Sequence, residues 1–360
     1  MPPPTSPESL PTDTDDRKQL RRFAYLLLIA IAGGLGAASI CRVQPLLSAN
    51  DRSRWATVRA LIEFDTWQID DVIRDDGWDS IDKVRHEDHF YSSKPALLPL
   101  LVSWVYSAVW MTSDALDGEA ATERDAKQHD GWTLEDETAE TTRAILILVN
   151  LIPWLAALVV IAAMVERYAE SDYTRLFVVA TAALGTILST FLVTLNNHLI
   201  ATVAVVFALY PAMRIVIDGE RKWWLFASAG FFSAFACANE LPAAAFGVLL
   251  FALLVWKSPR LTLAVFVPAA LIPIAAYFAA NYDCTGGWKP FYAYYGTEKY
   301  EYVHNGVPSY WTHPTGIDAN DEPPWLYFMH CTVGHHGLLS LSPVFLLAVA
   351  TFLATALIVD

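Results

Sequence analysis

The sequence predicts an all-α polytopic membrane protein, and its composition and long apolar segments are the basis of that prediction. Of the 360 residues, 54% are hydrophobic and only 17% are charged, whereas soluble domains carry about a quarter charged residues. Several apolar runs approach or exceed the roughly 20 residues that a helix needs to cross a bilayer. The net charge of −14 argues against nucleic acid as a partner, because a phosphate backbone attracts clustered lysine and arginine.

We expect residues 1–22 to be a disordered cytoplasmic tail and residues 23–360 to be one transmembrane domain. The tail begins with a stretch rich in Pro, Thr and Asp, a composition that does not form a core. Four basic residues then precede the apolar run 23–41. Because this run is as long as a span and no small-x-small cleavage site follows it, it is interpreted as a retained anchor helix rather than a cleaved signal peptide. The basic residues are Arg17, Lys18, Arg21 and Arg22.

About eight apolar segments are predicted to cross the membrane, and the basic residues predict their direction. Cytoplasmic loops collect Lys and Arg. The basic loops lie near 167–175, 214–222 and 257–260, and they alternate with turns that contain no Lys or Arg. All basic loops share the cytoplasmic side with the N-terminus only if segment 95–111 does not cross. The predicted spans are 23–41, 144–165, 176–194, 198–216, 223–238, 241–256, 261–280 and 338–358.

Segment 95–111 is therefore predicted to be a helix in the outer membrane interface, juxtamembrane and not spanning. It is short for a span and Pro99 interrupts it. This topology places loop 42–94, the acidic loop 112–142 and the aromatic loop 281–337 on the external face of the plasma or inner membrane. The chain ends directly after an apolar segment without flanking charges, from which we expect a piece of a longer protein.

The aromatic loop 281–337 suits either an interfacial belt or a wall that binds sugar or lipid. Cys284 and Cys331 lie at its two ends, and a disulfide between them is a possibility in an oxidising compartment. His335 and His336, just before the last apolar segment, are candidates for substrate binding or for an interfacial position.

Asp51 is the candidate catalytic residue of loop 42–94. It stands just before a helix in which Trp55, Val58, Leu61 and Ile62 share one face, a pattern suited to lying on a membrane. Asp51 is then either the N-cap of this helix or a general base kept ionised by nearby arginines.

Lys94 is the second candidate, ahead of a proline at a helix start. A lysine there either extends toward lipid headgroups or pairs with a lipid phosphate, and Tyr91 with the adjacent serines would add hydrogen bonds. Asn196, Asn197 and His198 form one external turn and Glu240 lies in another. These are ordinary turn residues, but both turns face the side of the membrane where Asp51 lies, which makes them candidates for substrate binding.

The sequence contains no His-x-x-x-His, Cys-x-x-Cys or glycine-rich phosphate loop, so we expect no cofactor. A divalent metal remains open. Carboxylates in loop 42–94 are the residue type that ligates a hard cation, although solvated loop residues are favoured for them. They are Asp70, Asp71, Asp75 and Asp76.

Two stretches resemble motifs of the GT-C membrane glycosyltransferases, in the branch of aminoarabinose transferases and protein O-mannosyltransferases. The stretch from Asp51 to Ala56, DRSRWA, resembles that branch's Asp-Glu-x-Arg-Tyr-Ala motif. The stretch from Tyr91 to Leu97, YSSKPAL, resembles its Tyr-x-x-Lys-Pro-Pro-Leu motif. The likeness lies in these motifs for residues 50–97 and in the architecture for the rest. Arg143 also matches an arginine position of the branch.

The resemblance implies a GT-C-like fold and a transferase that uses a polyprenyl-phosphate sugar as donor. Asp51 would deprotonate or orient the acceptor, which is a lipid, glycan or protein. Lys94, with Arg54 and Tyr91, would bind the donor phosphate, and a single displacement would invert the anomeric centre. Cationic side chains could stabilise this leaving group without metal. Arg52 stands where the branch has its second acidic residue, and Ala96 where it has its second proline.

A non-enzymatic transporter or flippase component is the alternative from another class. Transporters usually place ionisable groups near the bilayer midplane and interrupt their helices there. In this sequence the predicted spans are nearly free of charge and the polar residues gather at one surface, which favours the enzyme.

Overall fold

The computed structural model describes residues 15–117, 137–319, 321–335 and 337–358. Helices make up almost all of the regular structure in these ranges, in agreement with the predicted all-α membrane protein. Helix α1 (Asp15–Arg42) begins within the expected tail, so residues 15–22 are helical and not disordered. Residues 1–14 lie outside the described part, as does most of the acidic loop 112–142.

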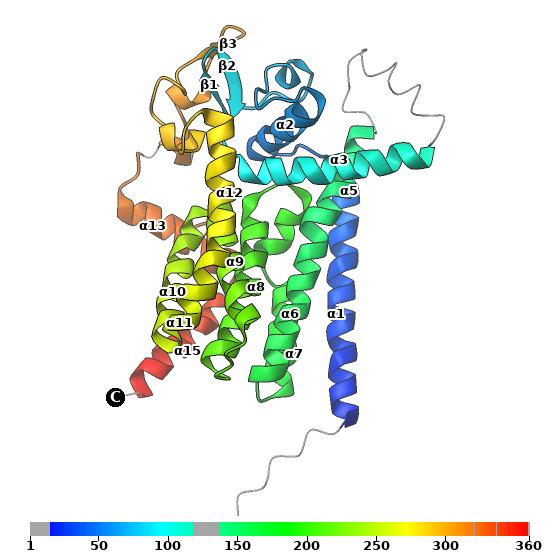
Figure 1. Cartoon of the computed structure of the whole chain (residues 1–360), viewed down its shortest axis with the longest axis vertical. Coiled ribbons are helices and arrows are strands. Elements are labelled where there is room, and N and C mark those ends of the chain that lie inside the picture. Colours follow the sequence, from blue (N-terminus) through cyan, green and yellow to red (C-terminus); the bar gives the residue numbers. More distant parts are fainter. Residues whose placement is uncertain (1–14, 118–136, 320, 336, 359–360) are drawn as a thin grey trace, which may run out of the picture.

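A bundle of helices runs along the long axis of the molecule (Figure 1). After α1 it contains α5 (Glu137–Leu146), which continues through a π-helical turn (Ile147–Leu151) into α6 (Ile152–Tyr168). Next come α7 (Asp172–Leu184), the 3₁₀ segment η3 (Ile187–Val193) and α8 (Asn197–Val216). The bundle goes on with α9 (Trp223–Asn239), a 3₁₀ turn (Leu241–Ala243), α10 (Ala244–Lys257), α11 (Pro259–Leu261), a second π-helical turn (Thr262–Phe266) and α12 (Val267–Thr285).

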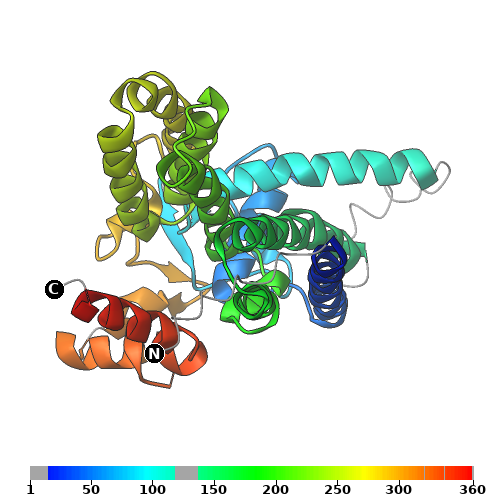
Figure 2. The ribbon, with the colours of Figure 1, turned by 90° about the horizontal axis from the view of Figure 1, so that it is seen from below.

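The C-terminal helices are α13 (Pro324–Thr332), α14 (Leu338–Leu341) and α15 (Phe345–Ile358). Seen from below, they gather at one side of the molecule, and α1 lies at the opposite side (Figure 2). The predicted span 338–358 thus corresponds to two helices separated by a turn.

In the part of the chain that the structure describes, five helical segments are long and apolar enough to cross a membrane. Their outward faces expose large apolar side chains, such as Leu26 on α1 and Leu271 on α12, and a continuous surface of this kind is suited to lipid. They coincide with five of the eight predicted spans, and the predicted spans 223–238, 241–256 and 338–358 correspond to shorter helices. The five segments are Asp15–Arg42, Ala139–Tyr168, Asp172–Val193, Asn197–Val216 and Pro259–Thr285.

The basic connections all gather at one end of the bundle. Arg21 of α1 forms ion pairs with Glu166 (2.6 Å) and Asp172 (2.9 Å) of the α6–α7 connection. Arg167 of this connection pairs with Asp218 after α8 at 2.6 Å. Further contacts at this end are Arg214 and Lys222 with Glu220, and Arg221 with the backbone oxygen of Lys257. The turns with Lys and Arg, which alternate along the sequence with turns that lack them, therefore lie together at one end of the molecule.

Helix α3 (Leu97–Asp117) lies across the other end of the bundle and not along it (Figure 1). It contains the segment 95–111 almost entirely. A helix in this direction does not run between the two ends of the bundle. This agrees with the expectation that segment 95–111 does not cross the membrane, which was needed to place all the basic loops on one side.

Helix α2 (Ala49–Glu63) packs beside α3 at the same end. Its side chains Trp55 and Val58 are 2% and 0% exposed and belong to a core that includes residues of α1, α6 and α8. The prediction that this helix lies on the membrane surface was wrong. The apolar face packs against protein, because the bundle beneath supplies the apolar surface that lipid would otherwise provide.

A small β-hairpin, β1 (Lys83–His86) and β2 (His89–Ser92), stands next to α2, with the 3₁₀ turn η1 (Val72–Arg74) nearby in the chain. Segment 288–312 of the aromatic loop covers this hairpin and contributes the short strands β3 (Val303–His304) and β4 (Val307–Pro308). Phe291 and Tyr300 are buried against Val84 and Tyr91. The other short helices of this loop are the 3₁₀ turns η6 (Phe291–Tyr294), η7 (Tyr310–Thr312) and η8 (Gly316–Ala319).

Phe291, Tyr300 and Tyr302 of the loop are thus buried core residues, whereas others such as Trp288 and Trp325 are exposed. Cys284 and Cys331 are both free thiols in the structure, so the disulfide considered between the ends of this loop is not formed.

Gly230 is the point of closest approach between α9 and the turn that leads into α12. A Cβ atom at this position would lie 2.3 Å from the backbone oxygen of Phe266. We predict that Gly230→Ala lowers the thermal stability of the purified protein, because forced repacking of a tight contact costs about 1–3 kcal/mol. Gly34→Ala on α1 is the matched control, since nothing lies within 4 Å of its Cβ position. Equal melting temperatures for the two variants would contradict this packing.

Candidate functional site

A cavity of about 610 Å³ lies at the end of the bundle opposite the basic connections. The two motif segments contribute Asp51, Arg54 and Lys94 to its lining, and the two turns without Lys or Arg contribute 194–198 and 238–242. The sequence predicted that these groups share one face, and the structure brings them to one cavity. The remaining wall is apolar and aromatic, formed mainly by Phe191, Cys237, Ile274, Tyr277, Phe278 and Tyr292.

Asp51 lies in the first turn of α2 and is not its N-cap. Helix α2 begins at Ala49, and the N-cap is Ser48, whose side chain accepts a hydrogen bond from the Asp51 N–H at 3.2 Å. The carboxylate of Asp51 accepts two other backbone N–H groups, from Leu195 (2.7 Å) and Leu47 (3.2 Å). Asp51 therefore connects α2 to the turn that starts α8, which is a different role from the N-cap considered from the sequence.

Burial raises the pKa of Asp51 to about 6, against the opposing effects of its two backbone donors and of Arg54. The side chain is 1% exposed, and desolvation disfavours the charged carboxylate. A carboxylate with a pKa near neutrality can both lose and accept a proton under physiological conditions, which is what a general base needs.

Arg54 lies one turn further along α2 and reaches across to α8. Its guanidinium donates to the backbone oxygens of Asn50 (3.0 Å) and Leu195 (3.4 Å) and to Oδ1 of Asn197. Burial lowers the pKa of Arg54 to about 10, so the group stays cationic at neutral pH.

Asn197, Glu240 and His198 continue this polar chain along the cavity. The amide of Asn197 donates to the backbone oxygen of Asn239 (2.7 Å) and to Oε2 of Glu240 (2.9 Å). Nδ1 of His198 lies 2.8 Å from the same Glu240 oxygen, and the imidazole is about half exposed. The cavity thus presents a carboxylate and a half-exposed imidazole that can exchange hydrogen bonds with a polyhydroxylated ligand, and the amide of Asn197 connects Arg54 to this carboxylate.

Asn196 lies at the cavity but its side chain is occupied by the local fold. Its Oδ1 accepts the N–H of Leu199 at 3.1 Å as the N-cap of α8. Its amide donates to the backbone oxygens of Phe191 and Thr194, both at 2.9 Å. The amide N–H groups and the oxygen of this side chain are thus bonded within the protein. Asn196 therefore fixes the shape of the cavity wall and was not confirmed as a group that binds substrate.

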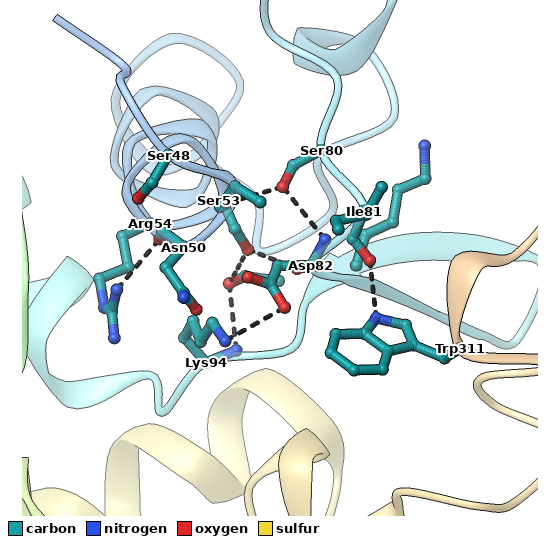
Figure 3. A network of polar contacts seen from close by, with 12 residues as sticks. Ser48, Asn50, Ser53, Arg54, Ser80, Ile81, Asp82, Lys94 and Trp311 are labelled. Atoms are coloured by element: carbon teal, nitrogen blue, oxygen red, sulfur yellow. Dashed lines mark hydrogen bonds and ion pairs between the residues drawn. The ribbon is translucent and has the colours of Figure 1, made fainter. Parts of the chain in front are cut away.

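Lys94 forms an ion pair with Asp82, Nζ to Oδ1, at 3.2 Å (Figure 3). The side chains are 20% and 6% exposed. Burial lowers the pKa of Lys94, and the Asp82 carboxylate opposes that shift. Sequence reasoning missed Asp82, because nothing in its spacing separates it from the solvated acids around it.

Arg52 occupies the position at which the family motif has its second acidic residue. Its guanidinium donates to the backbone oxygens of Asp79 (2.7 Å) and Leu46 (3.4 Å), and Arg52 is not part of the cavity lining.

Two predicted site residues that the structure describes, Tyr91 and His335, do not line this cavity. Tyr91 is buried against Val84 and Phe291 and borders a separate cavity of about 560 Å³. His335 is exposed in the turn between α13 and α14, and His336 lies outside the described residues. Arg143, the other residue of the family likeness, contacts the backbone oxygen of Val43 at 3.5 Å and is not part of the lining.

Three of the four acidic residues considered as cation ligands have partners within the protein, and the fourth, Asp76, is exposed. Asp71 pairs with Arg74 and Asp75 with Arg59, both at 2.7 Å. Asp70 accepts the N–H of Phe90 at 3.1 Å. Within the ranges that the structure describes, no group of three or more His, Cys, Asp or Glu side chains is arranged to hold a metal ion.

Apolar surfaces adjoin the polar side of the cavity. A second, almost wholly apolar cavity of about 290 Å³ lies between α3, α6, α8 and α9. Its lining includes Leu98, Ile200 and Phe235, each within four residues of Lys94, His198 or Asn239 in the first cavity. The arrangement fits an amphiphile with a charged polar head and an apolar tail.

No family model, curated protein or solved structure matches this chain. The chemistry of the cavity is therefore inferred from its own geometry.

Asn150 is a buried residue of this region that the sequence did not single out. Its amide, in the π-helical turn before α6, donates to the backbone oxygens of Phe191 (3.4 Å), Leu192 (3.1 Å) and Thr194 (2.8 Å). These carbonyls belong to the segment that presents the Leu195 N–H to Asp51. Its position as a polar residue within the apolar segment 144–165 is the sequence feature that could have identified it.

We predict that Asn150→Leu lowers the unfolding free energy by about 2 kcal/mol or more, because each buried group left without a partner costs about 1–3 kcal/mol. Thermal unfolding of the purified protein measures this. Thr190→Val is the control, since Thr190 bonds only locally, to the backbone oxygen of Ile187 at 2.7 Å. A melting temperature for Asn150→Leu equal to that of the control would contradict the anchoring role.

Proposed function

We propose that this chain is a membrane glycosyltransferase that moves a sugar from a polyprenyl-phosphate donor to an acceptor on the external face. One observation supports it most directly: a single cavity holds a carboxylate whose pKa burial raises to about 6, Asp51, with the buried cation Arg54 and the partly buried cation Lys94, beside an apolar wall. The resemblance of residues 50–97 to the GT-C motifs points to the same chemistry.

The cations fit the donor's head group and the apolar wall fits its chain. Hydrogen bonds between a cationic donor and a phosphate are about twice as strong as neutral ones. The ammonium of Lys94 carries three N–H groups, so it can contact a phosphate while it remains paired with Asp82. Ile274 and Phe278 of α12 face the same space and offer apolar contact to a prenyl chain.

In the proposed reaction, the acceptor's hydroxyl or amine attacks the anomeric carbon of the sugar. Its proton passes to the Asp51 carboxylate, while the bond between the anomeric carbon and the phosphate oxygen breaks and its electron pair stays on that oxygen. Arg54 and Lys94 stabilise the charge that develops there. Each oxygen of Asp51 accepts one backbone N–H and keeps a further lone pair for the proton. A single displacement of this kind inverts the anomeric centre.

Asn197, His198 and Glu240 would bind hydroxyl groups of the sugar or the acceptor. By the distribution of Lys and Arg, the basic end of the bundle would face the cytoplasm and the cavity would face the outside. The active groups lie at helix ends and in turns, at the end of the bundle where α3 crosses. This position suits an enzyme at the membrane surface better than a transporter, whose ionisable groups usually lie near the midplane.

The first test is transfer by the purified protein with a panel of radiolabelled polyprenyl-phosphate sugars. We expect Asp51→Asn and Lys94→Ala each to lower the transfer rate by about 100-fold or more, the range that a general base and a group that stabilises developing negative charge contribute. Asp88→Asn is the control, because Asp88 is 90% exposed and pairs only with Arg85 near the hairpin turn.

Undiminished transfer by Asp51→Asn would reduce Asp51 to its connection between α2 and α8. If no donor is used, but the protein moves labelled polyprenyl phosphate across vesicle membranes, the transporter alternative replaces the enzyme.

The pH dependence gives a second test of Asp51. The carboxylate must be ionised to take a proton, so the transfer rate should rise with pH and level off above about 6, the pKa to which burial raises this group. Asp51→Asn should lose this acidic limb as well as most of the rate. An acidic limb that persists unchanged in the residual activity of Asp51→Asn would assign the titration to another group.

A further inference from the structure

Asp82 stands behind Lys94 as seen from the cavity. Lys94 belongs to the cavity lining and Asp82 does not, yet their charged atoms lie 3.2 Å apart. Figure 3 shows the side chain of Lys94 beside the Asp82 carboxylate. Lys94 therefore has an anionic partner on its protein side and an accessible side toward a ligand.

The position of Asp82 is fixed by three segments of the chain. Its backbone oxygen accepts hydrogen bonds from the hydroxyl of Ser53 on α2 (2.5 Å) and from the N–H of Ser93 (3.1 Å). Its N–H donates to Oγ of Ser80 at 3.1 Å. Ser92 completes the network, because its hydroxyl bonds Ser53 at 2.6 Å and accepts the Lys94 N–H at 3.2 Å. The backbones of both partners are thus held in place before any ligand binds.

Charge makes this carboxylate important to the lysine. Burial and the neighbouring Arg54 of α2 lower the pKa of Lys94, whereas Asp82 and, more weakly, Asp318 of η8 raise it. A second cation beside a buried arginine is unfavourable unless an anion compensates it. Among these groups Asp82 is the one in direct contact.

We propose that Asp82 is a positioning residue that holds Lys94 at the cavity wall in its cationic form, ready for the phosphate of an anionic prenyl lipid. The proposal rests on the assignment of Lys94 to phosphate binding in the proposed function. The carboxylate itself does not touch the ligand; it acts through the lysine.

The test is the dissociation constant of farnesyl phosphate for the purified full chain, measured from pH 6 to 10, with inorganic phosphate as the head group alone. Asp82→Asn removes the charge and keeps the shape. We expect it to weaken farnesyl phosphate binding about tenfold or more at neutral pH. The pH at which alkaline solution abolishes binding should fall by about one unit or more, the size of effect that a contacting opposite charge has on a pKa.

Asp79→Asn is the matched control. Asp79 also pairs with a lysine, Lys83, one residue from Asp82 in the chain, but neither residue lines the cavity. We expect it to leave the dissociation constant and its alkaline limb unchanged. Asp82→Glu keeps the charge, so its alkaline limb should stay at the wild-type pH even where the affinity falls. It provides the readout if Asp82→Asn does not fold.

Unchanged or tighter binding by Asp82→Asn with an unshifted alkaline limb would overturn the proposal, and so would an alkaline limb of Asp82→Glu that shifts downward. In a Lys94→Gln background, Asp82→Asn should have no further effect on binding, because its action passes through the lysine. If Lys94→Gln alone binds farnesyl phosphate as well as wild type, the phosphate site of the proposed function fails. If Lys94→Gln is weak while Asp82→Asn is normal, only the role of Asp82 fails.

Discussion

Two opposite charges on one turn of α2, Asp51 and Arg54, are buried where the bundle ends, and the surrounding structure is built to satisfy them. A buried ion is tolerated only when hydrogen bonds and a counter-charge replace its water. Asp51 takes the N–H of Leu195, and Arg54 takes a carbonyl of the same residue and the side chain of Asn197. These donors and acceptors are free because the chain between α7 and α8 leaves the helical pattern.

Two asparagine side chains fix the backbone of this irregular connection. Asn150 binds three of its carbonyls and Asn196 caps the helix that follows. The amide side chains take the place of the backbone partners that a regular helix would supply. The polar end of the molecule is therefore one connected set of contacts, in which the cavity groups and the residues that position them share the same backbone segment.

The sequence was informative where an argument needed only segment lengths and the signs of charges. It predicted the helical class, the gathering of the basic turns at one end, and the position of Asp51, Lys94, Asn197, His198 and Glu240 on the opposite face. It failed where partners distant in the chain decide. Trp55 and Val58 look like a membrane-binding face until the bundle covers them, and Tyr91 looks like a site residue until the aromatic loop buries it. Asp82 and Asn150 carry no periodic or motif signal, because their importance comes from which segments fold against them.

The β-hairpin that follows α2 has a consequence for the cavity. Lys83 pairs with Ser92 in its ladder, so Asp82 and Ser93 are the first residues beyond its open end, and Lys94 follows directly after Ser93. A two-residue turn, Glu87 and Asp88, closes the other end with φ angles of 51° and 68°, the left-handed geometry that matches the twist of such strands. Side chains alternate along a strand, so a slip of one residue in pairing reverses the face of every side chain. A change in turn length that shifts the strand pairing by one residue would therefore move Asp82 away from Lys94, although no residue of the cavity is substituted. The ion pair at the cavity wall thus depends on the length of a turn outside the cavity.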